Sequence, residues 1–233
     1  NKKYKNLLNQ EKEINKLYKL IEDYEKYDLY LDNKKKKEVI KKFDPVNISE
    51  VYKKFKIRFS NSFYQRIDKV YNFKRRTNSF VDEYNDIFYT KEKKRFEKLF
   101  KTIEKKPLTD EQQLSVITDE ENTLVVAGAG SGKTSSIVAK TAYLIIKGIC
   151  LPKNILVLAY NKNASEELKE RIYKRIKNNK NINKTKLDSI EIRTFHSFGS
   201  SIITKVEKKS PSVSKLAEYD FQFKNFVKKN IDD

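Results

Sequence analysis

The chain has 233 residues, of which 36% are charged and 38% hydrophobic, and its formal net charge is +19 at pH 7. Its single cysteine excludes an internal disulfide framework and suits a reducing cytosol, and one cysteine with one histidine cannot build a zinc site. No apolar stretch approaches the roughly 18 residues that a membrane-spanning helix requires, so the composition indicates a cytoplasmic protein with no membrane partner, and the positive charge favours a polyanionic one.

The first 106 residues are predicted to form a basic, all-helical N-terminal region. They contain 30 Lys and Arg against 17 Asp and Glu, no Gly, and Pro45 as the only Pro. Apolar residues recur there at helical spacing, first in Leu7, Ile14, Leu17, Leu20, Ile21 and Tyr24, then in Phe55, Phe59, Phe63, Ile67 and Val70. We expect three or four helices, with a break near Pro45 and Ser49 capping the next helix. The first stretch is expected to pair as an antiparallel hairpin or coiled coil.

Residues 51–76 allow two interpretations. Nine basic residues lie among seven aromatic ones, and such a surface could bind single-stranded nucleic acid through stacking and phosphate contacts. However, Phe55, Phe59, Phe63 and Ile67 lie four residues apart, which is the spacing of one buried helix face. We favour core aromatics with solvated lysines.

From residue 107 the pattern changes to alternating strands and helices. Thr109 and Gln112 fit a capping box at the start of a helix. The predicted strands cover residues 122–126, 154–159 and 189–193, and the predicted helices cover 133–147, 163–177 and 195–205. This order is typical of an α/β fold with a parallel sheet flanked by helices, in which ligands bind at the carboxyl ends of the strands.

A glycine-rich turn joins the first predicted strand to the next helix. It reads Ala127, Gly128, Ala129, Gly130, Ser131, Gly132, Lys133 and Thr134, with Ser135 following in the helix. The glycines let the backbone turn its N–H groups inward around a phosphate at the N-terminus of the helix. We therefore predict a P-loop in which Lys133 reaches the β- and γ-phosphates of a nucleotide and the Thr134 hydroxyl holds Mg²⁺. Ala127 departs from the Gly that the strict pattern has at its first position.

Three further segments accompany the P-loop, one before it and two at strand ends. They are residues 108–116, residues 159–168 and Arg193-Thr194-Phe195-His196-Ser197. In order and spacing, the four segments resemble the N-terminal half of superfamily 1 DNA helicases of the UvrD/Rep type, in particular the bacterial helicase IV group, over roughly residues 107–220. The resemblance implies a RecA-like motor domain, incomplete at residues 107–205, with a helical insertion beginning at 206–233. It also implies ATP and Mg²⁺ as cofactors, single-stranded and duplex DNA as partners, and 3′-to-5′ movement.

The same resemblance assigns roles to individual side chains. Gln112 would read the adenine edge, although the capping-box contact competes for the same side chain, and Gln113 is a nearby alternative. Lys133 and Thr134 would take the catalytic roles. Single-stranded DNA would contact Tyr160, Asn161, Lys162, Thr194, Phe195 and His196. Tyr160 would stack on a base or plug the end of the sheet, and Phe195 would stack or pack.

The order Asn161-Lys162-Asn163 departs from the usual Thr-Asn-Lys of this family, which leaves open which of the three meets phosphate. Hydrolysis also needs an apolar strand that ends in Asp-Glu, and no segment between Thr134 and Asp233 fits. We therefore expect an N-terminal portion of an ATP-dependent helicase that turns ATP over poorly or not at all when alone.

The start of the chain at Asn1 and its lack of Met also suggest a fragment of a larger protein. The alternative is a non-catalytic, helicase-like module that docks on nucleic acid or on a protein, for example RNA polymerase, through residues 1–106. A small-molecule P-loop kinase is a weaker rival, because it would not explain the Gln112 segment or Thr194-Phe195-His196.

Overall fold

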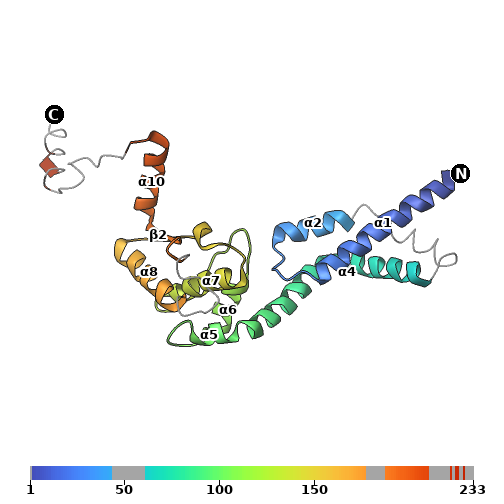
Figure 1. Ribbon diagram of the computed structural model, residues 1–233, viewed down its shortest axis with the longest axis horizontal. Coiled ribbons are helices and arrows are strands. Elements are labelled where there is room, and N and C mark those ends of the chain that lie inside the picture. The colour runs from blue at the N-terminus through green and yellow to red at the C-terminus, as the bar shows by residue number, and fades with distance from the viewer. Residues whose placement is uncertain are drawn as a thin grey trace. The chain divides into compact units, whose positions relative to one another are not determined.

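The computed structural model describes residues 2–43, 61–176 and 187–209, with residues 221, 224, 225 and 228; for residues 2–10, 61 and 78 it describes the backbone. The chain forms two compact units, Asn1–Tyr143 and Leu144–Asp233 (Figure 1). No helix within the described ranges has the length and apolar character needed to cross a membrane.

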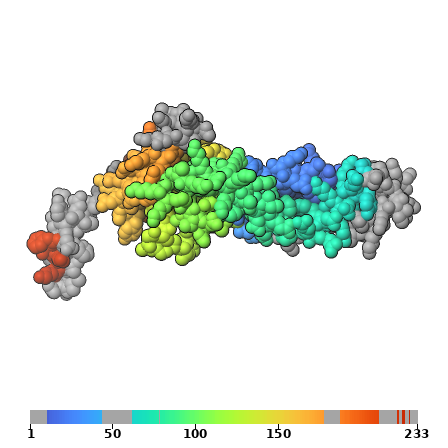
Figure 2. Space-filling view, turned by 90° about the horizontal axis from the view of Figure 1, so that it is seen from below, coloured from blue at the N-terminus to red at the C-terminus, as the bar shows by residue number. Residues whose placement is uncertain are grey.

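Three helices build the N-terminal part of the first unit. α1 (Lys2–Glu25) and α2 (Asn33–Phe43) both pack against α4 (Asn61–Arg95), and the contact between α2 and α4 is visible at the surface (Figure 2). α1 runs along α4 in the same direction, and α2 runs in the opposite direction (Figure 1). The contacts that fix these directions are Arg66 to Asn15, Lys69 to Glu25, Lys36 to Asp82 and Phe43 to Phe73. α1 and α2 are therefore antiparallel, with α4 as their shared neighbour.

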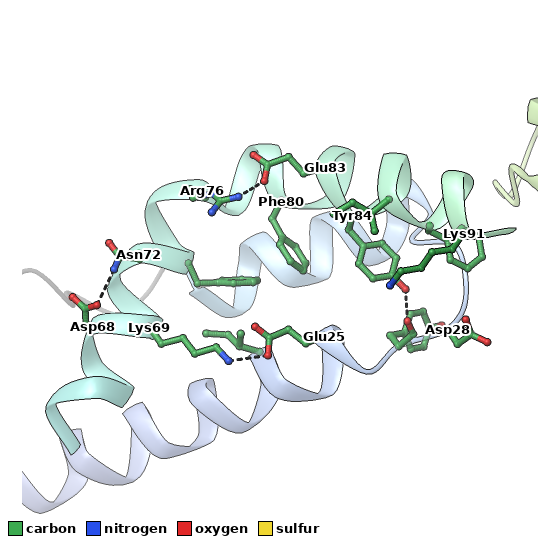
Figure 3. A pocket seen from close by; sticks show the side chains of 15 residues that line it. Glu25, Asp28, Asp68, Lys69, Asn72, Arg76, Phe80, Glu83, Tyr84 and Lys91 are labelled. Atoms are coloured by element: carbon green, nitrogen blue, oxygen red, sulfur yellow. Dashed lines mark hydrogen bonds and ion pairs between the residues drawn. The ribbon is translucent and has the colours of Figure 1, made fainter. Parts of the chain in front are cut away.

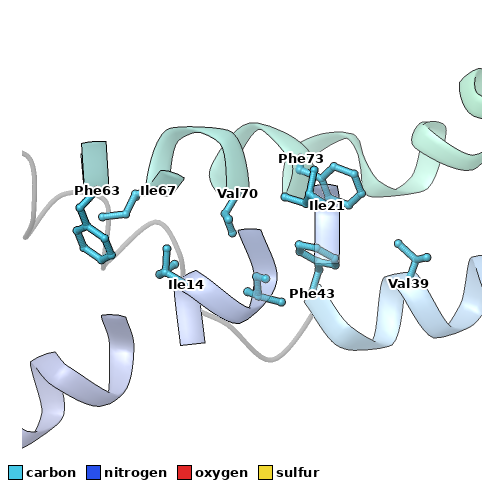
Figure 4. Close-up of a cluster of buried hydrophobic side chains, with 9 residues drawn as sticks. Ile14, Ile21, Val39, Phe43, Phe63, Ile67, Val70 and Phe73 are labelled. Atoms are coloured by element: carbon cyan, nitrogen blue, oxygen red, sulfur yellow. The ribbon is translucent and has the colours of Figure 1, made fainter. Parts of the chain in front are cut away.

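The core of this part is built from apolar side chains at helical spacing on all three helices (Figure 4). It contains Ile14, Leu17, Ile21, Val39, Phe43, Phe63, Ile67, Val70 and Phe73. For Phe63 and Ile67, this confirms the interpretation of the aromatic spacing as a buried helix face. The remaining residues of that pattern, Phe55 and Phe59, lie outside the described residues.

A cavity of about 590 Å³ lies between the C-terminal part of α1 and the middle of α4 (Figure 3). Its walls include the aromatic rings of Phe73, Phe80, Tyr84 and Phe88. The Tyr84 hydroxyl donates to the carbonyl oxygens of Tyr27 and Leu29, the latter at 3.1 Å. These bonds hold the turn after α1 against α4.

Glu120, in the segment before the glycine-rich turn, holds the start of α2. Its Oε2 accepts hydrogen bonds from the backbone N and the Nδ2 of Asn33 at 3.0 and 3.2 Å, and its Oε1 accepts one from the Tyr30 hydroxyl at 3.1 Å. A carboxylate at a helix N-terminus satisfies a free N–H group and interacts favourably with the helix dipole. The helical N-terminal part and the segment that leads into the turn are thus joined within one unit.

Three further helices complete the first unit around the turn. They are α5 (Glu97–Thr102), α6 (Asp110–Ile117) and, after the turn, α7 (Lys133–Lys147). The buried carboxylate of Glu92 on α4 accepts a hydrogen bond from the Tyr143 hydroxyl of α7 at 2.7 Å. The ring of Tyr143 packs edge-on against Phe96, with 4.9 Å between the centroids. These contacts anchor the helix that follows the glycine-rich turn to α4.

The second unit contains a two-stranded parallel sheet with helices beside it. Its elements are η1 (Pro152–Asn154), β1 (Leu156–Ala159), α8 (Lys162–Ile176), β2 (Glu191–Thr194) and α10 (Phe195–Glu207). β1 pairs with β2 from Leu156 opposite Glu191 to Ala159 opposite Thr194. α8 connects the strands and buries Leu168, Ile172 and Ile176. Helices beside a parallel strand pair agree with the predicted α/β class for this stretch.

The strand predicted at residues 122–126 is wrong as stated. This segment is irregular in the structure, and the side chains of Leu124 and Val126 are each 88% exposed. A strand exists only when a neighbour pairs with its N–H and C=O groups, and the paired strands of the described chain, β1 and β2, both belong to the other unit. The other predicted strands are confirmed in shorter form, and the predicted helices at 133–147, 163–177 and 195–205 are found within two residues at each described end.

Several sequence predictions lie outside the described residues. These are the break near Pro45, the cap by Ser49 and residue 177 at the end of the predicted helix 163–177. The proposed boundaries at residues 106 and 205 stay predictions.

Candidate functional site

Two of the three glycines in the glycine-rich turn have the left-handed backbone conformation that glycine favours. Gly130 and Gly132 have positive φ angles, 74° and 88°, which residues with a side chain rarely adopt. Between them, Ser131 donates from its backbone N at 3.4 Å and from its Oγ at 2.8 Å to the carbonyl oxygen of Gly128. The turn is therefore closed by bonds of its own before the chain enters α7.

The ammonium group of Lys133 lies over the beginning of this turn. Its Nζ donates to the carbonyl oxygens of Ala127 at 3.0 Å and of Gly128 at 2.6 Å, while the side chain stays exposed to solvent. Neutral carbonyls are weaker partners for a cation than an anionic oxygen is. A phosphate at the turn would therefore be favoured by the same ammonium, which makes the residues present suitable for a polyphosphate ligand.

Thr134 and Ser135 occupy the first turn of α7 and are partly buried. The first N–H groups of a helix have no carbonyl partner within that helix. The N-terminus of α7 therefore presents N–H donors to an anion. The described residues include no cluster of three or more His, Cys, Asp or Glu side chains that could hold a metal ion. The Mg²⁺ contact of the Thr134 hydroxyl stays a prediction.

Gln112 lies beside the same turn and uses both ends of its side-chain amide. Its Oε1 accepts from the backbone N of Thr109 at 3.0 Å, while its own backbone N donates to the Thr109 hydroxyl at 3.4 Å, which completes the predicted capping box. Its Nε2 donates to the carbonyl oxygen of Ser131 at 2.9 Å. This last contact was not anticipated from the sequence, although the lack of a side chain at Gly132 is the signal that could have suggested a close neighbour.

Gln113, the alternative reader of adenine, turns away from the loop. Its Nε2 donates to the carbonyl oxygen of Leu108 at 2.8 Å. Adenine recognition by Gln112 or Gln113 stays a prediction.

In the second unit, the residues predicted to contact DNA gather at the carboxyl ends of β1 and β2. Ala159 pairs with Thr194, so Tyr160 and Phe195 follow directly on neighbouring strands, whose axes lie about 4.8 Å apart in a sheet. Tyr160 is 86% exposed and Phe195 is 59% exposed. Both rings thus reach the solvent at the strand ends, and whether Tyr160 stacks on a base or plugs the sheet, and whether Phe195 stacks or packs, stays a prediction.

Polar residues at these strand ends also begin the helices that follow. Asn161 accepts at Oδ1 from the backbone N of Ala164 at 2.8 Å, which caps α8. The Thr194 hydroxyl accepts from the backbone N of Ser197 at 3.1 Å, which caps α10. Lys162 and His196, by contrast, are exposed beside them.

The structure thus groups the predicted site residues into two sets. The glycine-rich turn and Gln112 belong to the first unit, whereas Tyr160, Asn161, Lys162, Thr194, Phe195 and His196 belong to the second.

Comparison with known proteins gives matches over the second half of the chain. The family described as UvrD/REP helicase N-terminal domain matches residues 108–231. The chain is 41% identical over 117 residues to DNA helicase IV of Escherichia coli (strain K12), covering 50% of this chain and 16% of that protein. It is 38% identical over 96 residues to a probable DNA helicase II homolog of Mycoplasma capricolum, covering 41% of this chain and 12% of the relative.

A third relative is the ATP-dependent DNA helicase Rep of Buchnera aphidicola. The chain is 39% identical to it over 82 residues, which covers 35% of this chain and 12% of the relative. In all three cases the matching region is less than a fifth of the relative's length.

Proposed function

Because the chain belongs to the UvrD/REP helicase N-terminal domain family, we propose that it supplies the nucleotide-binding part of an ATP-dependent DNA helicase or translocase. The observation that carries the proposal is the closed glycine-rich turn with Lys133 over its carbonyl oxygens. Relatives whose names include DNA helicase, one of them ATP-dependent, support ATP and DNA as the ligands. Movement in the 3′-to-5′ direction follows from the family resemblance.

Five residues of the turn have physical roles in this proposal. Gly128, Gly130 and Gly132 let backbone N–H groups face the phosphates, and the start of α7 adds its free donors. Lys133 moves its ammonium from the carbonyl oxygens of the turn to phosphate oxygens. Thr134 holds Mg²⁺ through its hydroxyl. Bound ATP supplies a phosphoanhydride bond whose hydrolysis can drive movement along DNA.

The strand ends of the second unit are the proposed contact for single-stranded DNA. Two exposed aromatic rings, Tyr160 and Phe195, suit stacking on bases without regard to sequence. Lys162 and His196 beside them suit contacts to the phosphate backbone. Asn161 and Thr194 then contribute mainly by fixing where α8 and α10 begin.

The experiment is a measurement of ATP binding by calorimetry and of ATP hydrolysis with and without single-stranded DNA. We expect Lys133→Ala to weaken ATP binding at least tenfold, because a charge-assisted contact to phosphate is lost. Lys98→Ala removes an exposed lysine of α5 and serves as the charge-matched control. Equal ATP binding by both variants would contradict the proposal.

Hydrolysis then separates two forms of the proposal. Binding without DNA-stimulated turnover would support a chain that supplies only the nucleotide-binding part. DNA-stimulated turnover that Lys133→Ala abolishes would instead mean that the chain is a motor by itself.

A further inference from the structure

We propose that the exposed face of α2 is a contact surface for the phosphate backbone of duplex DNA. This surface consists of Lys34, Lys37 and Lys41, which we name the lysine stripe. The inference rests on the proposed function in taking DNA as the ligand. It concerns a different part of the chain from the phosphate loop and from the strand ends of β1 and β2.

Positive charge is concentrated on α2, where six of eleven residues are lysines and one is acidic. Lys34, Lys37 and Lys41 follow one another at spacings of three and four residues, so they share one face of the helix. This face is exposed, whereas Val39 and Phe43 on the other side are buried in the core. The stripe is about 10 Å long, and a DNA duplex carries one charge for about every 1.7 Å of its axis. Several phosphates therefore lie within reach of the stripe.

The chain itself neutralises little of this charge. Lys34 pairs with Glu121 at 3.8 Å, and both side chains are mostly exposed, at 67% and 64%, so the pair is weak. Lys37 and Lys41 face the solvent with no acidic partner among the residues that the structure describes. Their ammonium groups are thus available to an anion from outside the chain.

α2 is fixed in place before any ligand binds. Glu120 accepts hydrogen bonds from the backbone N and the Nδ2 of Asn33, the first residue of the helix, at 3.0 and 3.2 Å. Lys36 donates to Asp82 of α4 at 2.8 Å, and the apolar side of α2 is packed in the core. A surface that is already rigid loses little conformational freedom on binding, which favours affinity.

α4 extends the positive surface beyond the C-terminal end of α2. Because the two helices are antiparallel and Lys36 pairs with Asp82, the residues of α4 that precede Asp82 lie toward the end of α2. Arg75 is seven residues, about two helical turns, before Asp82 and so lies on the same face of α4. It is exposed, with its guanidinium 5.8 Å from the ring centroid of Tyr71. The basic surface therefore continues from one helix to the next.

The chemistry of the stripe favours a duplex over a single strand or a membrane. Single strands are bound through the stacking of bases on aromatic rings, as proposed for Tyr160 and Phe195, and the stripe consists of lysines alone. Lysine ammonium groups bind phosphates without contacting the bases, and a duplex presents its phosphates while its bases stay paired. A basic helix binds a membrane by inserting its apolar face, but that face of α2 is buried in the core.

The experiment measures fluorescence anisotropy of a labelled DNA duplex of about 20 base pairs over a series of salt concentrations. The stripe variant carries Lys34→Gln, Lys37→Gln and Lys41→Gln, because glutamine and lysine have similar helix propensity. We expect it to bind the duplex about tenfold more weakly and to lower the salt slope by about 2–3, since each phosphate contact contributes about 0.9. Its binding of a labelled oligothymidylate should change by less than about threefold.

The matched control removes the same charge at exposed lysines outside α2, with Lys98→Gln, Lys105→Gln and Lys106→Gln. It should weaken duplex binding by less than about threefold. Lys37→Gln alone is a second test, because Lys41 lies in the last turn of α2, where a cation also stabilises the helix dipole. Lys37 lies before that turn, so its replacement should lower the salt slope by about 1 and leave the Tm unchanged.

Three results would overturn the inference. Equal weakening by the stripe variant and its control would reduce the effect to net charge, and unchanged duplex binding would remove any role of the stripe. An equal loss for the oligothymidylate would make the stripe a general phosphate surface with no preference for a duplex.

The proposed function fails in a different way. A chain that binds no ATP in calorimetry would contradict the proposed function and leave the result for the stripe intact. A chain that binds ATP through Lys133, but whose duplex affinity does not depend on the stripe, would keep the proposed function and lose this inference.

Discussion

Gly132 is the residue at which the chemistry of the loop depends most on the absence of a side chain. Two separate features disfavour a side chain at this residue, its positive φ and its short distance to Gln112. The chain also has a glycine at which only the positive φ applies. Gly148 has φ of +79° with open space around the position of a Cβ. Gly199 lies within α10 and has neither requirement.

We expect Gly132→Ala to destabilise the chain and to weaken nucleotide binding, because the new methyl group brings left-handed strain into the turn and makes the Gln112 amide shift. Gly148→Ala should cost only the left-handed strain, about 1–2 kcal/mol, and keep nucleotide binding. Gly199→Ala should raise stability by about 0.5–1 kcal/mol, since Ala is favoured over Gly within a helix. Urea unfolding and ATP calorimetry on the three variants check this order, and normal binding by Gly132→Ala would contradict it.

Among the helices and strands, the sequence predicted those elements whose pattern depends only on residues close together along the chain. Helical spacing and capping residues located the start of α6 and the described ends of α7, α8 and α10 to within two residues, because these features depend on neighbours along the chain. The segment 122–126 has an apolar sequence typical of a strand, but its pairing depends on strands elsewhere, which no local pattern reports.

In the candidate site, too, some features follow from residue type, and others depend on contacts between residues that are distant in the sequence. The positive φ angles of Gly130 and Gly132 and the cap by Thr109 could be predicted from residue type. The bond from Gln112 to Ser131 joins residues 19 positions apart, and no local rule places those two atoms together. The hydrogen bond from Tyr143 to Glu92 could not be predicted from the sequence either, because it depends on how α4 and α7 pack.

The contact between α4 and α7 can be tested by removing a single oxygen atom. Tyr143→Phe keeps the ring against Phe96 but deletes the hydroxyl that donates to buried Glu92. A buried acceptor that loses a partner costs about 1–3 kcal/mol, and we expect a decrease of that size in the free energy of unfolding in urea. Tyr160→Phe, at an exposed ring, should change stability by less than about 0.5 kcal/mol, and equal effects of the two changes would argue against the contact.

The turn between α1 and α2 should make the first unit sensitive to alkali. Burial together with Glu120 raises the pKa of Tyr30 to about 12, and burial together with Asp28 raises the pKa of Tyr84 to about 12. A tyrosine with a raised pKa stabilises the folded state below its ordinary value of about 10, and this contribution is lost as the pH rises from 10 to 12.

We therefore expect the free energy of unfolding to fall over that interval. In Tyr84→Phe the fall should be smaller, because phenylalanine has no proton to lose. Urea unfolding at pH 9, 10 and 11 provides the measurement, with phenolate absorbance as an independent record of the titration. An identical pH dependence in the variant would show that Tyr84 does not titrate as its surroundings suggest.

Considered as a whole, the chain combines a strong positive charge with two separate sets of candidate ligand residues. The net charge of +19 will attract any polyanion, so binding of DNA alone says little about the strand ends of β1 and β2. A useful test must compare variants of equal charge at one salt concentration.

Tyr160 offers such a comparison. Tyr160→Ala should weaken binding of a labelled oligothymidylate about tenfold, since stacking of one base on an aromatic ring is worth about 1–3 kcal/mol. Tyr160→Phe keeps the ring and should bind as the unaltered chain does. Fluorescence anisotropy at fixed salt checks both, and equal binding by all three proteins would place the DNA contact elsewhere.

The unbroken course of α4 has a mechanical consequence. The helix has 35 residues and is therefore about 50 Å long. Near its C-terminal end it contacts α6 and α7 on either side of the phosphate loop, and along its N-terminal half it carries α1 and α2. A tilt of this helix at the loop would therefore move its N-terminal end much farther than the loop itself. A tilt of about 5° at the loop would displace the N-terminal end of α4 by about 4 Å. A small adjustment of the loop atoms would thus become a larger displacement at that end, to which a bound partner could respond.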